Sequence, residues 1–436
     1  MRIVRLIALI AGTLCLLALP VAAAATAHAA TPGDLKRAAR GLPGASGSYV
    51  YDVTAGKPLL NQRGGAKRIL ASNTKLFTAA TALARYGPDK HFITSLWTDG
   101  TVQNGVLNGN VYLRGGGDPL FGNTAYVKRF FGSGATVEQL ALNARIVGIT
   151  GITGRVYGDE SMFDSLRGTA TYGFRRSGEI GGQLGALIFN KGLNGGAYQS
   201  NPPRFAAQRM RAALKAAGVP VTGSTGVQPT PPGSRVIAYV ESLPVSQIVH
   251  LMDKPSNNYL AEMLAKGLAM PAEALRGGGA APGGGAAASG GDLVLTNAAP
   301  ATTRAGTGVA RGFARTLGSR VAMGDGSGLS RTDRAAPREV VDLLRGMSTR
   351  AGFAPFDQSL PIAGVDGTLK NRMRGTDASR RCRGKTGTLS NVSALSGYCT
   401  TASGRLIAFS ILNNRVWPPA ARAAQDRIVK AIADLD

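Results

Sequence analysis

The chain has 436 residues, of which 44% are hydrophobic, and a formal net charge of +25. Its length exceeds what one hydrophobic core usually organises, so two or three domains are expected. No helix or short segment concentrates the Lys and Arg residues as a nucleic-acid reader would, which argues against that class of partner. For an exported protein the expected polyanions are cell-surface polymers, and a solvated basic surface is the plain alternative.

The first 29 residues have the pattern of a secretory signal peptide. Arg2 and Arg5 precede an apolar stretch over residues 6–21, and Ala27-His28-Ala29 matches a small-residue cleavage site. The apolar stretch is shorter than the ~20 residues that a membrane-spanning helix needs. We therefore expect cleavage after Ala29 and a mature protein outside the cytoplasm, in the cell wall or periplasmic space. A retained anchor is the alternative.

Strands and helices are expected at both ends of the remaining chain. Residues 47–53 predict a strand that turns back at 54–58, and a helix begins around Ser72 and ends at Gly87-Pro88. Near the other end, residues 383–389, 394–399 and 406–412 predict three strands, and a final helix follows Pro418-Pro419. This symmetry predicts one discontinuous domain, formed by residues 30–92 and 240–436.

The middle of the chain differs in character. From 93 to 239, short apolar runs alternate with Gly and Asn turns, which predicts a mainly β insertion. Residues 276–291 are nearly all Gly, Ala and Pro, so we expect a flexible loop over 271–303.

Ser72-Asn73-Thr74-Lys75 is the first candidate for chemistry. A serine at a helix start and a lysine three residues later share one face, so the amine can approach the hydroxyl. Burial beside another cation would lower the pKa of Lys75 and let it take the serine proton. Taken alone, this short match is more often a helix cap followed by a surface lysine.

Two further short motifs follow in the chain. Ser256 and Asn258 precede a helical run, where a serine can pass a proton and an asparagine can hold an amide, although helix capping explains the pair equally well. Lys385-Thr386-Gly387-Thr388 is expected in a strand, where the glycine allows a peptide backbone to come close. In this order, S-x-x-K, S-x-N and K-T-G form the signature of penicillin-binding proteins and class A β-lactamases, although the middle motif reads S-N-N here rather than S-D-N.

Five strings extend the similarity across nearly the whole mature chain: ASNTKL (71–76), LRGGGDP (113–119), SNNYLAE (256–262), DGSGLSR (325–331) and GKTGTL (384–389). With them the chain resembles the DacB-like D-alanyl-D-alanine carboxypeptidase/endopeptidase family of low-molecular-mass penicillin-binding proteins. Ser72 and Ser256 are 184 residues apart, and that family is known for an insertion between these motifs. The resemblance implies an α/β (α+β) transpeptidase fold of the penicillin-binding and β-lactamase type, with an antiparallel sheet flanked by helices.

The resemblance also implies a hydrolase that cleaves peptidoglycan stem peptides through an acyl-enzyme. Ser72 would be the nucleophile, Lys75 its base, Ser256 a proton relay and Asn258 an amide-binding group. Lys385, Thr386 and Thr388 would receive the terminal carboxylate beside Gly387, and the backbone N–H groups of Ser72 and Thr388 would form the oxyanion hole. β-Lactams would be covalent inhibitors. No cofactor and no metal site are expected, and peripheral association with the cell wall or membrane surface stays open.

The two cysteines that remain after signal removal predict a disulfide. If residues 383–389 and 394–399 form a hairpin with its loop at 389–392, Thr388 opposes Ser393 and Cys382 opposes Cys399. Directly opposed residues lie within disulfide range, and an exported protein is in an oxidising compartment. We therefore expect a bridge that fastens the substrate-binding hairpin.

Three other functions compete with this interpretation. A class A β-lactamase needs a glutamate in an E-x-x-L-N loop, and no such string follows Ser256. A Ser-His-Asp hydrolase would use His91 or His250, but no G-x-S-x-G elbow is expected. A non-catalytic wall-binding protein would need none of the three motifs.

Overall fold

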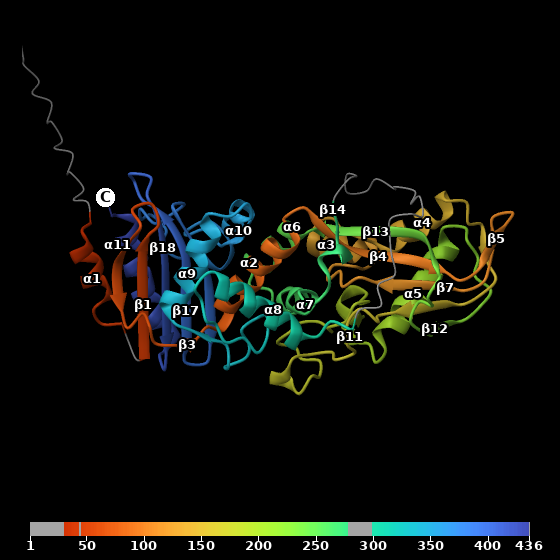
Figure 1. The fold of residues 1–436 in the computed structure, drawn as a ribbon, viewed down its shortest axis with the longest axis horizontal. Coiled ribbons are helices and arrows are strands. Elements are labelled where there is room, and N and C mark those ends of the chain that lie inside the picture. The colour runs from red at the N-terminus through yellow and green to blue at the C-terminus, as the bar shows by residue number, and fades with distance from the viewer. Residues whose placement is uncertain (1–29, 43–44, 278–298, 436) are drawn as a thin grey trace, which may run out of the picture.

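The computed structural model describes residues 30–42, 45–277 and 299–435. Two bodies follow each other along the long axis, one formed by the two ends of the chain and one by its middle (Figure 1). The expected signal peptide and most of the expected Gly/Ala-rich loop lie outside the described residues. In the described part, no helix combines the length and the apolar character needed to cross a bilayer.

The first body is built on an antiparallel five-stranded sheet of order β16-β17-β18-β1-β2. Strands from both chain ends therefore pair directly, and the four strands predicted at 47–53, 383–389, 394–399 and 406–412 are confirmed. The strands are β1 (Ala45–Asp52), β2 (Lys57–Gln62), β16 (Cys382–Leu389), β17 (Val392–Thr400) and β18 (Leu406–Asn414).

Helices cover both faces of this sheet, which explains why its central strands are buried almost throughout. Val50 packs in the cluster on the side of α1 and α11, whereas its neighbours Tyr49 and Tyr51 pack in the cluster with the remaining helices. The helices of this body are α1 (Pro32–Ala39), α2 (Thr74–Tyr86), α6 (Val245–Asp253), α7 (Asn258–Gly267), α8 (Thr303–Thr316), α9 (Pro337–Ser348), α10 (Phe353–Ser359) and α11 (Pro418–Ala433).

The second body contains a mixed sheet of order β12-β9-β7-β4-β13 and a smaller three-stranded sheet. The expected strands are present, and three helices accompany them. The strands are β4 (Lys90–Thr98), β5 (Thr101–Gln103), β6 (Val106–Asn108), β7 (Val111–Gly115), β8 (Gly151–Ile152), β9 (Val156–Asp159), β12 (Thr225–Val227) and β13 (Arg235–Pro244). The helices are α3 (Thr124–Phe131), α4 (Val137–Ile146) and α5 (Pro202–Ala216).

Short strands connect these parts. In the described ends of the 271–303 segment, β14 (Arg276–Gly277) pairs with β4, and Ala301 bridges to Phe163. The other short strands are β3 (Arg68–Ile69), which pairs with β15 (Arg334–Ala335), and β10 (Leu193–Asn194), which pairs with β11 (Ala197–Tyr198).

Candidate active site

Ser72 lies in a short 3-10 turn, η1 (Ala71–Asn73), immediately before α2. The helix thus begins two residues later than the expected Ser72, and the serine occupies the tighter turn. Neighbouring glycines enclose this turn: a Cβ on Gly328 would lie 1.8 Å from the Ala71 carbonyl oxygen, and one on Gly387 would lie 3.0 Å from the Ser72 nitrogen. Only glycine allows this approach, so two segments distant in sequence close around the candidate nucleophile.

Lys75 is fully buried one helical turn after Ser72. Its ammonium donates to three oxygens: Ser72 Oγ at 3.0 Å, Asn258 Oδ1 at 2.7 Å and the Ser327 carbonyl at 2.7 Å. Burial lowers the pKa of Lys75 to about 8, against the opposing pull of buried carboxylates led by Glu262. When Lys75 is neutral, its two N–H groups can stay with Asn258 and Ser327, which leaves the lone pair facing Ser72.

The Ser327 carbonyl is held by a loop with buried acids. Glu262 accepts hydrogen bonds from the backbone N–H of Gly326 at 3.1 Å and of Ser327 at 2.9 Å. Asp325 accepts from the N–H of Gly328 and of Ser330, both at 2.7 Å. Burial raises the pKa of Glu262 to about 8, with a further contribution from Asp325. The acids therefore fix the loop that supplies one of the acceptors of Lys75.

Asn258 is the first residue of α7, but it is not the cap of that helix. The preceding Asn257 accepts the Leu260 N–H at 3.1 Å and caps it, so Asn258 is free to serve the site. Its Nδ2 donates to the Glu179 carbonyl at 2.8 Å, which orients Oδ1 toward Lys75. The capping interpretation thus applies to Asn257. The contact of Asn258 also shows that the segment around Glu179, from the middle of the chain, borders the site.

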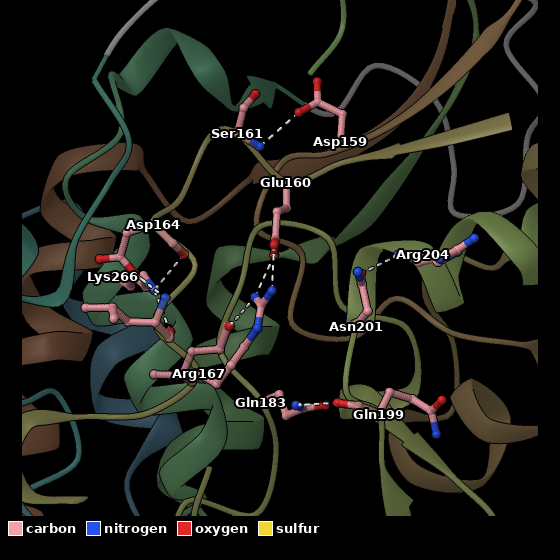
Figure 2. Close-up of polar contacts among 12 residues, drawn as sticks. Asp159, Glu160, Ser161, Asp164, Arg167, Gln183, Gln199, Asn201, Arg204 and Lys266 are labelled. Atoms are coloured by element: carbon pink, nitrogen blue, oxygen red, sulfur yellow. Dashed lines mark hydrogen bonds and ion pairs between the residues drawn. The ribbon is translucent and has the colours of Figure 1, made fainter. Parts of the chain in front are cut away.

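The far end of α7 is anchored in the second body (Figure 2). Lys266, only 1% exposed, donates to Asp164 Oδ1 at 2.5 Å and to the Leu166 carbonyl at 3.0 Å. Arg167 from the same segment forms a two-pronged ion pair with Glu160, at 2.5 and 2.6 Å. These contacts stabilise α7, and with it Asn258, against the inserted part of the chain.

Lys385 is the second buried lysine of the site and lies on β16. Its Nζ donates to Ser256 Oγ at 2.8 Å and to the Thr386 carbonyl at 3.1 Å. Burial and then the charge of Lys75 lower the pKa of Lys385 to about 7, while the buried carboxylate of Asp253 opposes that decrease. Ser256 itself has a positive φ of 63°, in the turn between α6 and α7.

The open edge of β16 carries the two threonines of the third motif. On the side of β16 that faces away from β17, the Cys382 carbonyl accepts from the Ala363 N–H, and the Gly384 N–H donates to the Pro361 carbonyl. Because the direction of backbone groups alternates along an antiparallel strand, the N–H groups of Thr386 and Thr388 also face this open side. Thr386 Oγ1 donates to Thr368 Oγ1 at 2.7 Å.

A cation from another element reaches the same edge. The guanidinium of Arg422, on α11, donates to Thr388 Oγ1 at 3.3 Å. Positive charge therefore lies beside the hydroxyl that the resemblance assigns to carboxylate binding.

The structure brings the three motifs together around Ser72. Four contributors were not predicted from sequence: the Ser327 carbonyl, Asp253, the Glu179 carbonyl and Arg422. Ser327 lies within the string 325–331 and Asp253 lies three residues before Ser256, so the sequence motifs pointed to both regions. No sequence motif pointed to Glu179 or Arg422. The string 113–119 is not part of the site, since it ends β7, where Gly115 packs against the backbone of Ala186.

The hairpin prediction is confirmed. Thr388 pairs with Ser393 and Cys382 with Cys399, and the two cysteines form a disulfide with a Cα–Cα distance of 4.0 Å. The bridge closes the end of the hairpin opposite its turn at residues 390–391.

The alternative nucleophile partners do not contact Ser72. The His91 ring bonds the Ser242 carbonyl at 2.7 Å. Burial lowers the pKa of His250, which lies on α6 beside Lys254. Among the described residues, no group of three or more His, Cys, Asp or Glu side chains is arranged to hold a metal ion. The described chain therefore offers a lysine, not a histidine, as the partner of the serine.

Comparisons with known proteins agree with this geometry. Residues 29–173, 191–278 and 296–435 match the D-Ala-D-Ala carboxypeptidase 3 (S13) family. A D-alanyl-D-alanine carboxypeptidase of an Actinomadura species is 30% identical, over 89% of this chain and 81% of the relative. Carboxypeptidase DacB of Mycolicibacterium smegmatis is 29% identical, over 85% and 76% of the two chains.

A solved structure supports the fold. Penicillin binding protein 4 (DacB) of Haemophilus influenzae matches with a TM-score of 0.69 at 20% identity, over 92% of this chain and 98% of that chain. A mixed α/β fold with antiparallel sheets is thus shared at low identity. From the matched residues and the 30% identical relative, the chain belongs to the D-Ala-D-Ala carboxypeptidase 3 (S13) family.

Proposed function

We propose that this protein is a serine-type D-Ala-D-Ala carboxypeptidase, with endopeptidase action on crosslinked stem peptides at the same site. One observation carries the proposal: a fully buried amine, that of Lys75, lies 3.0 Å from a serine hydroxyl, and neutral acceptors occupy its other two donors. A base so placed has a pKa of about 8, close to the pH at which it must work.

Acylation follows from the positions of these groups. Lys75 takes the Ser72 proton while Oγ bonds to the carbonyl carbon of the D-Ala-D-Ala peptide. The resulting oxyanion would lie between the N–H groups of Ser72 and Thr388, and the close approach of Gly387 to the Ser72 nitrogen supports this position. As the C–N bond breaks, the proton that Lys75 took from Ser72 passes through the Ser256 hydroxyl to the leaving amine. Water later attacks the acyl ester, so that its hydroxyl stays on the acyl group and its proton returns to Ser72.

Substrate recognition uses the edge of β16. The terminal carboxylate of the substrate binds the hydroxyls of Thr386 and Thr388, and the charges of Lys385 and Arg422 stabilise it. Asn258 holds the amide on the acyl side. An endopeptidase substrate places a crosslinked D-amino acid here instead, and this residue also ends in a carboxylate.

β-Lactams would acylate the same serine and leave slowly. Among the described residues, no carboxylate hydrogen-bonds to Ser72 or Lys75, and both oxygens of the nearby Glu262 already accept backbone N–H groups. Among these described residues there is thus no candidate for the glutamate that activates the deacylating water in a class A β-lactamase. We also propose that the protein is secreted and acts in the cell wall, consistent with the pattern of residues 1–29.

Mass spectrometry after incubation with penicillin tests the nucleophile. The wild-type chain and the surface variant Ser133→Ala should gain the mass of one penicillin and keep it over hours, whereas Ser72→Ala should gain none. Acylation of Ser72→Ala would contradict the proposal, and rapid turnover by the wild type would indicate a β-lactamase. Release of D-alanine from muropeptides, or cleavage of crosslinked dimers, then measures the two activities separately.

A further inference from the structure

A basic cavity of about 480 Å³ lies in the first body, next to the active site. Five of its lining side chains are cationic: Lys67, Arg68, Arg331, Arg334 and Arg415. Its other lining residues are Ala, Ile, Val or Asn, so the described wall contains no carboxylate. Such a concave surface of one sign concentrates the electrostatic potential and attracts anions.

Arg68 shows that this charge is built into the fold. The residue is only 6% exposed, and its guanidinium donates to the backbone carbonyls of Ala45, Ser46, Arg63 and Ala66, at 2.5 to 3.0 Å. All of these acceptors are neutral. A buried cation is expensive unless an opposite charge compensates it, and among the described ion pairs none involves Arg68. An anion in the cavity would supply that charge.

Among the described residues, the arginines around the rim are also without an acid as ion-pair partner. Arg331 donates to the Ser390 carbonyl at 2.8 Å and to Asn391 Oδ1 at 3.4 Å, both neutral. The exposed Arg334 and Arg415 are in none of the described ion pairs, and Lys67 reaches Glu339 only at 4.0 Å. The guanidinium donors of Arg334 and Arg415 are therefore available to a ligand, whereas those of Arg331 are partly used.

The cavity shares two segments with the active site. Asn391 lies in the turn of the β16–β17 hairpin and Val392 begins β17, and the first strand of this hairpin carries Lys385. Arg331 ends the loop 325–331, whose Ser327 carbonyl accepts from Lys75, and its side chain ties that loop to the hairpin turn. A ligand in the cavity would thus lie beside the site without occupying it.

We infer that this cavity binds oxyanion groups, phosphate or carboxylate, of an anionic cell-wall polymer, and so holds that polymer beside the catalytic serine. Arginine forks match both oxyanions in a two-pronged geometry. A concave cavity admits a polymer side group, whereas a flat lipid surface could reach only the rim. Binding at a second point raises the effective concentration of the polymer at the site without changing the chemistry of acylation.

Isothermal titration with tripolyphosphate and with citrate tests the site on the full chain. The variant Arg334→Gln with Arg415→Gln removes two rim charges, and Arg304→Gln with Arg315→Gln removes two exposed charges on α8 as a matched control. We expect the cavity variant to lose at least about tenfold in affinity and the control to lose less than about twofold, because only the first pair lines the cavity. Equal losses in both variants, or no binding by the wild type, would overturn the inference.

Two further arms identify the source of the oxyanion and the consequence for function. Stronger binding of tripolyphosphate than of citrate indicates a phosphate polymer, and the reverse indicates a carboxylate polymer; tighter binding to anionic vesicles than to either probe would refute a polymer site. With whole cell walls, the cavity variant should have a KM raised about threefold or more. Penicillin acylation of both variants should match the wild type, which shows that they are folded, and a failure of acylation in the wild type would count against the proposed function alone.

Discussion

Two buried lysines of the site, Lys75 on α2 and Lys385 on β16, differ in their surroundings. Lys75 donates to a hydroxyl, a side-chain amide and a backbone carbonyl, all neutral. The nearby acid Glu262 accepts hydrogen bonds from the backbone of the loop that carries Ser327, and it does not bond to the amine of Lys75. Lys385 donates to Ser256 and a carbonyl, and the fully buried Asp253 stabilises its charge.

The difference teaches how one site can use the same side chain for two tasks. A base must give up its charge readily, so neutral partners suit Lys75, and they also aim its lone pair. A carboxylate-binding cation must keep its charge, and Asp253 favours the charged form of Lys385. Burial and the charge of Lys75 nevertheless leave the pKa of Lys385 below that of Lys75, so the carboxylate of a bound substrate must complete the stabilisation of this charge. The pKa values of about 8 and about 7 show that burial dominates for both, and that the second lysine also experiences the charge of the first.

Removal of the Lys75 amine should have the largest effect. Lys75→Met should lower the rate of penicillin acylation on the order of 10³-fold, because no other described base reaches Ser72. In the wild type at saturating penicillin, the acylation rate should rise with pH and level off above about 8, since deprotonation of Lys75 produces the active form, whereas loss of the Lys385 charge should weaken binding instead. Stopped-flow acylation from pH 6 to 10 measures both quantities.

The surface variant Lys370→Met is the matched control for this experiment, and it should acylate like the wild type. A Lys75→Met protein that keeps more than a tenth of the wild-type rate would contradict the assignment of the base. At saturating penicillin, a rate that falls toward high pH would do so as well, because the step after binding would then require charged Lys75.

Glu262→Gln tests whether the acids act through the loop. Glutamine has one acceptor where Glu262 uses two, so one buried N–H of Gly326 or Ser327 loses its partner at a cost of ~1–3 kcal/mol. If that cost displaces the Ser327 carbonyl, acylation should fall about 10- to 100-fold. Exposed Glu273→Gln is the control. An unchanged rate together with lower thermal stability would show that the loop position does not matter for Lys75.

How much of this site could be predicted depended on the kind of contact. Ser72, Lys75, Ser256, Asn258 and Lys385 were predicted as residue types in ordered motifs, and the hairpin register followed from the period of a strand. Backbone carbonyls cannot be predicted in this way, because any residue can supply one. The Ser327 and Glu179 carbonyls therefore became visible only when the fold placed their segments beside Lys75 and Asn258.

The fold was predictable where the pattern was local. The strands β1, β16, β17 and β18 and the helices α2, α7 and α11 were predicted because local apolar patterns are bounded there by turn residues or prolines, whereas α1, α6, α8, α9 and α10 were not predicted. The helices α3, α4 and α5 were not predicted, because the short apolar runs between glycines in this region are typical of strands. The helix α5 nevertheless begins at Pro202 and buries Phe205, Met210 and Leu214 at helical spacing. Arg422 was missed because its contact with Thr388 joins α11 to β16, which no local pattern relates.

Asp253→Asn should sharpen the contrast by weakening the charge of Lys385 more than that of Lys75, because Asp253 ranks behind Glu262 and Asp325 among the acids that act on Lys75. Without the carboxylate that opposes its decrease, the pKa of Lys385 should fall below about 7. In a Ser72→Ala background, a carboxylate ligand that cannot acylate should then lose affinity at a lower pH than in the parent. Titration of the dissociation constant from pH 5 to 9 measures the midpoint. Asp366→Asn, which removes an acid paired with Lys254 instead, should leave this midpoint in place. An unshifted midpoint in Asp253→Asn would mean that the carboxylate has only a structural role.

Arg422→Gln should have the smallest effect, because the guanidinium is exposed and meets Thr388 at 3.3 Å. Solvent screening limits such a contact, so KM for peptides with a free terminal carboxylate should rise about two- to fivefold with kcat unchanged. The same peptides with an esterified terminus carry no charge for Arg422 to attract, and their KM should be the same in both proteins. An equal rise for both peptides would place Arg422 outside carboxylate recognition and leave Lys385 as the cation of that wall. A rise in KM confined to the free acid would show that Lys385 and Arg422 share the binding of the carboxylate. Burial lowers the pKa of the first cation, and solvent screens the charge of the second.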